Sequence, residues 1–186
     1  MLFRSVEVAA GPTGNAERMK QLHVLRFDAA NDHGRQVIES LPEAWRPKVI
    51  AVNGQEGFSA MTVVRALRQG AVVAMLGDRM VDDRTVEVRF LGAPCRFPAG
   101  PWMLAALARV PVIVVGNFKE DADTYRVIAS PPIQCRFDRS RSRDAQVTEW
   151  AQAFADRLEE MVRRYPDQYY NFHDLWRAQA PVGSRE

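Results

Sequence analysis

The chain has 186 residues, of which 47% are hydrophobic, and a formal net charge of +2. This length and apolar content suit a single domain with its own core, and the small net charge argues against a strongly basic nucleic-acid binder. Cys95 and Cys135 have no Cys or His ligands beside them, so they predict neither a metal site nor a disulfide framework and favour a reducing compartment.

Short apolar runs alternate with polar helical segments over residues 6–52. In chain order, we expect a strand at Val6–Ala10, a helix at Asn15–Gln21, a strand at Leu22–Phe27, a helix at Asp32–Leu41 and a strand at Lys48–Val52. Alternation of this kind is typical of an α/β protein.

A helix followed by a buried strand is predicted over residues 58–76. Gly70 stands where the glycine at the end of a helix belongs, and Ala71–Leu76 is a continuous apolar run, as expected of a strand covered on both faces. The helix is indicated by apolar residues at helical spacing, namely Phe58, Met61, Val64 and Leu67. No apolar run approaches the roughly 18 residues that span a bilayer.

The second half begins with a strand over residues 84–90, whose charged and apolar residues alternate and predict one wet face. Pro101–Arg109 is an apolar helix, and Val112–Val115 is a second buried strand with which Tyr125–Ala129 is expected to pair. Ser130–Arg143 is rich in Pro, Arg and Ser and is predicted to be an exposed connection.

A long C-terminal helix follows. One apolar stripe on it is formed by Trp150, Phe154, Leu158 and Met161 or Val162. The elements together predict one domain over residues 1–186 of α/β class, with a mostly parallel or mixed sheet flanked by helices.

A charged pair ends the run Met75-Leu76-Gly77-Asp78-Arg79. A short β excursion follows, and then the segment Phe97-Pro98-Ala99-Gly100-Pro101 opens a helix. We expect a polar pocket here, because α/β proteins place ligands at the carboxyl ends of their strands.

Four segments together resemble the bacterial lipid A biosynthesis acyltransferases (lauroyl/myristoyl acyltransferases), within the wider lysophospholipid and glycerol-phosphate acyltransferase group. They are Ala71–Arg79, Phe90–Pro94, Phe97–Gly100 with Val110-Pro111-Val112, and Tyr165–Trp176. The resemblance implies a glycerol-phosphate-acyltransferase-like fold and transfer of a fatty acyl chain to a hydroxyl of a glycolipid acceptor. The implied donor is an acyl thioester of acyl carrier protein or coenzyme A, with no cofactor or metal.

The resemblance also implies substrate-binding residues and a location. Arg79, beside Asp78, would bind an acceptor phosphate through paired hydrogen bonds. The block Phe97, Pro98 and Gly100 helps to hold that phosphate in the wider group, although Ala99 replaces the acid expected there. The implied location is the cytoplasmic face of the cell inner membrane, either peripheral or through an N-terminal anchor that is missing here.

The family's catalytic segment is approximately His-x-Gly-Asn-x-Glu, and here it departs from that pattern. Gly14, Asn15 and Glu17 match, so Glu17 is the catalytic acid of the resemblance, but Pro12 occupies the place of the histidine. Proline has no nitrogen that accepts a proton, so we expect little or no activity. His23 and Asp28 have the same spacing, but both fall on a predicted strand, where they face opposite sides.

Two explanations of the start of the chain and two further functional hypotheses are considered. Met1–Ser5 fits no predicted element, so we expect residues 1–20 to be an unreliable or truncated start, with a true degenerate homologue as the alternative. A non-catalytic homologue that binds lipid or acyl carrier protein is the second functional hypothesis. An α/β nucleotide binder is the third, and it is disfavoured because the chain lacks a G-x-G-x-x-G or Walker element.

The remaining candidates have packing interpretations as well as functional ones. Tyr165–Trp176 is interpreted as an aromatic segment that docks the terminal helix, and His173 as a packing residue within it. The arginines of the predicted connection either attract anionic lipid headgroups or are simply solvated. They are Arg136, Arg139, Arg141 and Arg143.

Overall fold

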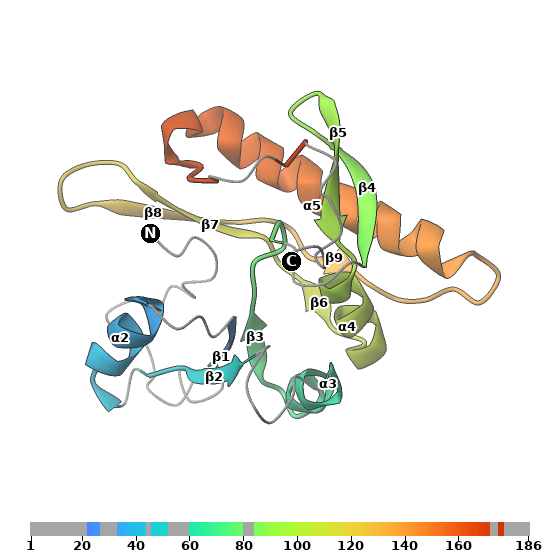
Figure 1. The fold of residues 1–186 in the computed structure, drawn as a ribbon, viewed down its shortest axis with the longest axis horizontal. Coiled ribbons are helices and arrows are strands. Elements are labelled where there is room, and N and C mark those ends of the chain that lie inside the picture. The colour runs from blue at the N-terminus through green and yellow to red at the C-terminus, as the bar shows by residue number, and fades with distance from the viewer. Residues whose placement is uncertain are drawn as a thin grey trace, which may run out of the picture.

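The computed structural model describes residues 22–26, 33–43, 46–51, 60–79, 84–171 and 175–176 (Figure 1). Its elements are β1 (Leu22–Arg26), α2 (His33–Ser40), β2 (Lys48–Ala51), α3 (Ala60–Arg68), β3 (Val72–Ala74), β4 (Thr85–Phe90), β5 (Ala93–Pro98), α4 (Gly100–Ala108), β6 (Pro111–Val112), β7 (Val115–Lys119), β8 (Tyr125–Ala129), β9 (Ile133–Gln134), α5 (Arg143–Arg164) and η2 (Pro166–Gln168). This mixed α/β arrangement, with sheets flanked by helices and a long C-terminal helix, confirms the predicted fold class.

The first three strands form a parallel sheet in the order β2-β1-β3. His23 of β1 pairs with Lys48 on one side and with Val73 on the other, so β1 is the central strand. The strands, α2 and α3 were all predicted, and Gly70 ends the α3 segment at φ +86°, a conformation that glycine adopts without strain. The elements expected at Val6–Ala10 and Asn15–Gln21 lie outside the described residues.

β3 differs from its prediction. Only Val72–Ala74 is strand, and the side chain of Val72 is 46% exposed, so the expected cover on both faces is wrong. β3 pairs with β1 alone among the described strands and is therefore an edge strand of this sheet. Its apolar continuation instead serves packing, because Met75 contacts the small cluster of α3 and α4.

β4 and β5 form an antiparallel hairpin whose turn is Leu91–Gly92. Both turn residues have positive φ, 52° and 85°, as in a type I′ turn, one of the two common two-residue hairpin loops. Val88 and Phe90 are buried while Glu87 and Arg89 are exposed, which confirms the strand with one wet face.

The predicted buried strand Val112–Val115 is wrong as one element. β6 pairs with β9 and β7 pairs with β8, so the chain changes its strand partner between them, and Ile113 is 48% exposed at the change. Tyr125–Ala129 was expected to pair with Val112–Val115; it forms a strand, but it pairs with β7, and only Val115 of the predicted partner takes part. All pairings beyond the first sheet are antiparallel among the described strands.

The connection predicted to be wholly exposed over Ser130–Arg143 also needs correction. It contains β9, and the Cys135 side chain that follows β9 is 1% exposed within the core. The helix α5 then begins at Ser142, whose hydroxyl accepts a hydrogen bond from the N–H of Ala145. The arginine-rich part, residues 136–143, is mostly exposed, with Phe137 partly buried.

α5 lies across the β4–β5 hairpin and provides the centre of the core (Figure 1). Its predicted apolar stripe is confirmed, because Trp150, Phe154, Met161 and Val162 are buried and Leu158 packs beside them. No helix among the residues described is both long and apolar enough to cross a bilayer.

Candidate functional site

Asp78 and Arg79 follow β3 and lie close to α5. A Cβ atom on the preceding Gly77 would come within 2.7 Å of Cζ of Phe154, closer than real carbon atoms approach. Only glycine lets the backbone of this segment pass so near the ring. The position of the charged pair therefore depends on an α5 residue that is distant in sequence.

The Asp78 carboxylate is held by the C-terminal segment. The hydroxyl of Tyr169 donates a hydrogen bond to Oδ2 of Asp78 at 2.9 Å, and Nδ2 of Asn171 donates to that hydroxyl oxygen at 3.2 Å. Burial, and then the charge of Asp78, raise the pKa of Tyr169 above its ordinary range. The phenol thus keeps its proton and can remain the donor.

Phe97 and Pro98 end β5 and are buried, whereas Gly100 at the start of α4 is half-buried. The Phe97 ring is 0% exposed and lies 5.7 Å from the Phe154 ring, centroid to centroid. The carbonyl oxygen of Pro98 accepts a hydrogen bond from Nε1 of Trp102 at 3.0 Å. These side chains shape the start of α4 through packing.

The first turn of α4 has no side-chain cap. Its N-cap is Ala99, which offers no side-chain acceptor, and Pro101 has no N–H. A Cβ atom on Gly100 would meet no atom within 4 Å, so there is open space beside this helix end. Uncapped N–H groups and the helix dipole favour an anion at such a position.

Phe154 joins the two segments. Its ring lies against Gly77 and against the rings of Phe97 and Trp102. The structure therefore places the segment that ends in Asp78 and Arg79 and the segment that opens α4 on one aromatic cluster.

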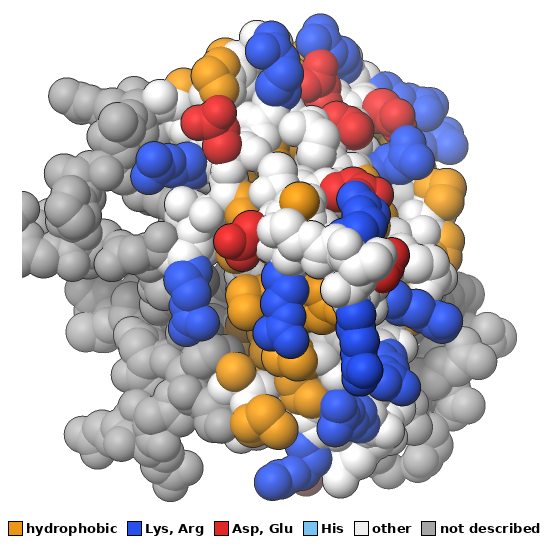
Figure 2. All heavy atoms as spheres, turned by 90° about the vertical axis from the view of Figure 1, so that its right-hand side faces the viewer, with side chains coloured by type: hydrophobic (Ala, Val, Ile, Leu, Met, Phe, Trp, Pro, Cys, Tyr) orange, Lys and Arg blue, Asp and Glu red, His pale blue; other side chains and the backbone are white. Residues whose placement is uncertain are grey.

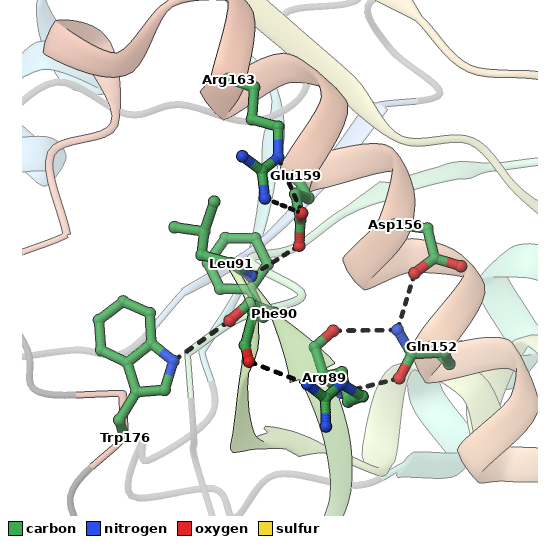
Figure 3. Close-up of polar contacts among 9 residues, drawn as sticks. Arg89, Phe90, Leu91, Gln152, Asp156, Glu159, Arg163 and Trp176 are labelled. Atoms are coloured by element: carbon green, nitrogen blue, oxygen red, sulfur yellow. Dashed lines mark hydrogen bonds and ion pairs between the residues drawn. The ribbon is translucent and has the colours of Figure 1, made fainter.

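Polar side chains of α5 fix the hairpin in place (Figure 3). The amide of Gln152 accepts from the N–H of Arg89 and donates to its carbonyl, at 2.8 and 2.9 Å, as a neighbouring strand would. Glu159 accepts from Arg163 and from the N–H of Leu91, and both interactions hold the pKa of its carboxyl below the usual range. Nε1 of Trp176 donates to the carbonyl oxygen of Phe90 at 3.3 Å.

A polar groove opens beside this contact between α5 and the hairpin. It contains none of the residues predicted to bind substrate. It is lined by Arg89, Gly92, Gln152, Asp156, Glu159, Glu160 and Arg163.

The model of one protein family, bacterial lipid A biosynthesis acyltransferase, matches residues 22–178. The chain belongs to this family. No curated protein matches it. The match confirms the resemblance stated above and identifies the chain as an acyltransferase of the lipid A biosynthesis type.

The residues that match the family's catalytic motif are not described by the structure, whereas the acceptor-binding segments are. Pro12, Gly14, Asn15 and Glu17 lie outside both the matched range and the described residues. His23 is in the middle of the sheet, on a strand rather than at a strand-to-helix turn, and Asp28 lies outside the described residues. No acid–base pair of the acyltransferase type is therefore present in the described part.

Cys95 and Cys135 are buried thiols. Burial raises the pKa of Cys95 to about 11 and that of Cys135 to about 12, so both remain protonated and poorly nucleophilic. Both are free, as the sequence predicted. Within the described ranges, no three His, Cys, Asp or Glu side chains form a cluster that suits a metal ion.

Three residues at the site were not singled out for it by the sequence: Gly77, Phe154 and Tyr169. Tyr169 belongs to the segment interpreted as an aromatic dock, and its ring does pack edge-on against Phe90 at 5.8 Å between centroids. Its bond to Asp78 crosses 91 positions, so no local spacing indicates it. His173 lies outside the described residues.

Proposed function

We propose that this acyltransferase acts on a phosphorylated glycolipid at the cytoplasmic face of the inner membrane. A hydroxyl of the acceptor attacks the carbonyl carbon of an acyl thioester, the new ester bond forms, and the thiol of acyl carrier protein or coenzyme A leaves with a proton. Residues 1–186 would form a single acyltransferase-like domain associated peripherally with the membrane.

The uncapped start of α4 is the observation that carries the acceptor site. It has no side-chain cap, a Cβ atom on Gly100 would meet no described atom within 4 Å, and α4 shares the Phe154 cluster with the segment of Asp78 and Arg79. A phosphate bound there would receive backbone hydrogen bonds and the favourable end of the helix dipole.

Arg79 would supply the cationic partner of that phosphate. A guanidinium forms two parallel hydrogen bonds to a phosphate, which fixes the orientation of the acceptor as well as its affinity. Asp78 would position the segment rather than contact the phosphate, because its carboxylate accepts the Tyr169 hydroxyl. Phe97 and Pro98 would act by fixing the start of α4.

Glu17 would orient the general base of the reaction, but Pro12 stands where that base belongs. Without an imidazole, the acceptor hydroxyl has no group placed to take its proton. We therefore expect acceptor binding with little or no transfer by this chain.

Pro12 also supports a second candidate function, a non-catalytic homologue that binds the lipid acceptor or the acyl carrier protein. For a homologue that binds the lipid acceptor, the two candidates share the acceptor site and differ in whether restoring the base restores acyl transfer. Restoring the base distinguishes them.

The test combines an acceptor-binding assay with a transfer assay on the full chain. We expect a phosphorylated lipid A precursor to bind, Arg79→Ala to weaken binding at least tenfold, and Arg157→Ala on the exposed side of α5 to leave it unchanged. No binding by the unsubstituted chain would refute the acceptor site.

In the transfer assay, labelled acyl carrier protein and acyl-coenzyme A serve as donors. We expect Pro12→His to raise transfer, and Pro12→His combined with Glu17→Ala to abolish the gain. If Pro12→His stays inactive but still binds the acceptor, the non-catalytic function is the correct one. Transfer by the unsubstituted chain that His23→Ala abolishes would contradict the assignment of the base.

A further inference from the structure

α4 has an unusual solvent face. None of its nine residues has a charged side chain or a hydroxyl, and the single polar group, Nε1 of Trp102, is bonded to Pro98. Trp102 and Leu104 are buried, but Leu107 is 47% exposed and Met103, one turn earlier, is half-buried. Helices at a water-facing surface normally place polar residues on that side, so this apolar stripe indicates a partner.

α3 places a second stripe beside it. Met61, Arg65 and Arg68 recur at i, i+4 and i+7 and lie on one side of the helix, with Met61 58% exposed. The opposite side, Val63 and Val64, packs against α4.

A hydrogen bond joins the two stripes. Nη2 of Arg68 donates to the carbonyl oxygen of Leu107 at 2.9 Å. The exposed parts of the two helices are therefore neighbours. We call this surface the α3–α4 face; it consists of Met61, Arg65, Arg68, Met103, Leu107 and Arg109.

The charge of the α3–α4 face has one sign. It carries three arginines, and neither α3 nor α4 contains an acidic residue. In Figure 2 the upper half of one side of the molecule mixes acidic with Lys and Arg side chains, whereas the lower half, at the height of α3 and α4 in Figure 1, shows mainly apolar and Lys or Arg side chains.

We propose that the α3–α4 face docks this chain on an anionic lipid surface. Met61, Met103 and Leu107 would enter the headgroup region, while the arginines contact lipid phosphates and their apolar stems cover the interface. A second copy of the chain fits less well, because self-association through this face would bring arginines against arginines.

Docking here also suits the proposed acceptor site, and in that respect the inference rests on the proposed function. Gly100 and Leu107 are seven residues apart on α4, or about 10 Å along the helix axis. A lipid bound at the start of α4 would therefore lie within about 10 Å, along the helix, of the exposed Leu107 on the docking face.

The test is vesicle binding by the full chain without donor or acceptor. Vesicles of equal parts phosphatidylglycerol and phosphatidylcholine should bind the chain, vesicles of phosphatidylcholine alone should bind it far more weakly, and added salt should release it. Arg65→Gln combined with Arg109→Gln should weaken binding roughly 25-fold, since each arginine near an anionic surface contributes about fivefold. Leu107→Glu should weaken it further.

Two control variants make the same change of charge or polarity at other places on the surface. Arg96→Gln combined with Arg164→Gln removes two exposed charges from β5 and the end of α5, and Tyr125→Glu changes an exposed apolar residue of β8. Both should bind vesicles with nearly the unsubstituted affinity. Unchanged thermal unfolding confirms that the α3–α4 variants are folded.

The proposal of the docking face would be overturned if the chain did not bind anionic vesicles. It would also be overturned if the control substitutions, and not those in the α3–α4 face, weakened vesicle binding. Either result leaves the proposed function standing if Arg79→Ala still weakens acceptor binding. Vesicle binding through the α3–α4 face without any acceptor binding would instead overturn the proposed function alone.

Discussion

The three-stranded parallel sheet and the core around α5 are packed very differently. The sheet has two buried side chains among its described residues, Leu22 and Ala74. The small cluster of α3 and α4 has four buried residues, two of which belong to α4. The core around α5 is one continuous cluster of aromatic and aliphatic side chains from the hairpin, α4, β7 and α5.

The candidate site lies where these two regions meet. Asp78 and Arg79 extend from the sheet, whereas Gly100 starts a core helix, and Phe154 touches both segments. The core rather than the sheet therefore sets the geometry of the site, and substitutions in the core test that dependence.

The largest expected effect comes from Phe154→Ala. Removing this ring should lower the free energy of unfolding by about 3–5 kcal/mol, because it leaves a cavity among Phe97, Trp102 and Gly77. Val63→Ala in the smaller cluster should cost only about 1–2 kcal/mol. Urea unfolding measures both, and equal losses would contradict the difference between the two regions.

Gly77→Ala tests the close approach directly. The new methyl group would overlap the Phe154 ring, so we expect a loss of about 1–3 kcal/mol. The same substitution in a Phe154→Leu background should cost markedly less. If the cost is the same in both backgrounds, Phe154 does not position the Asp78 segment.

Tyr169→Phe should cost about 1–2 kcal/mol near neutral pH, since the Asp78 carboxylate loses a part-buried donor. The raised pKa of Tyr169 adds a pH dependence: the folded chain retains the phenol proton above pH 10.0, the ordinary pKa, where the unfolded chain releases it. Stability from this group is complete below that pH and falls as pH rises above it.

The difference in stability between the unsubstituted chain and Tyr169→Phe should therefore shrink progressively above pH 10, as followed by urea unfolding at several pH values. A difference that grows with pH would show that the Tyr169 hydroxyl is not held by Asp78.

The smallest expected effects concern the two glutamines that pair with strand backbone. Gln168 binds the N–H and carbonyl of Lys119 as Gln152 binds those of Arg89, each at 2.8–2.9 Å. We expect Gln152→Ala and Gln168→Ala each to cost about 1 kcal/mol. Gln152→Ala should speed hydrogen exchange at Arg89 but not at Lys119, and Gln168→Ala should do the reverse.

The periodic elements were predictable from the sequence because their burial repeats along the chain. The apolar stripe on α5 and the alternation of apolar and charged residues in β4 are each visible within a single element. The change of partner at Ile113 was not predictable, because an apolar run looks the same whether it pairs with one strand or two. The exposure of the edge strand at Val72 was not predictable for the same reason.

The site was predictable only in part. The motifs around Asp78, Arg79 and Gly100 led to the proposed acceptor site, and the family match covers all three residues without assigning them a role. The contacts of Phe154 with Gly77 and of Tyr169 with Asp78 join positions 77 and 91 residues apart, and no local pattern contains such information.

The most direct test of the acceptor site is a binding cycle on one phosphate. Affinity for the lipid A precursor is measured for the unsubstituted chain and for Arg79→Ala, each with the phosphorylated and the dephosphorylated acceptor. If Arg79 binds the phosphate, removing either partner weakens binding about tenfold or more, and removing both weakens it little further. Losses that simply add would contradict the account.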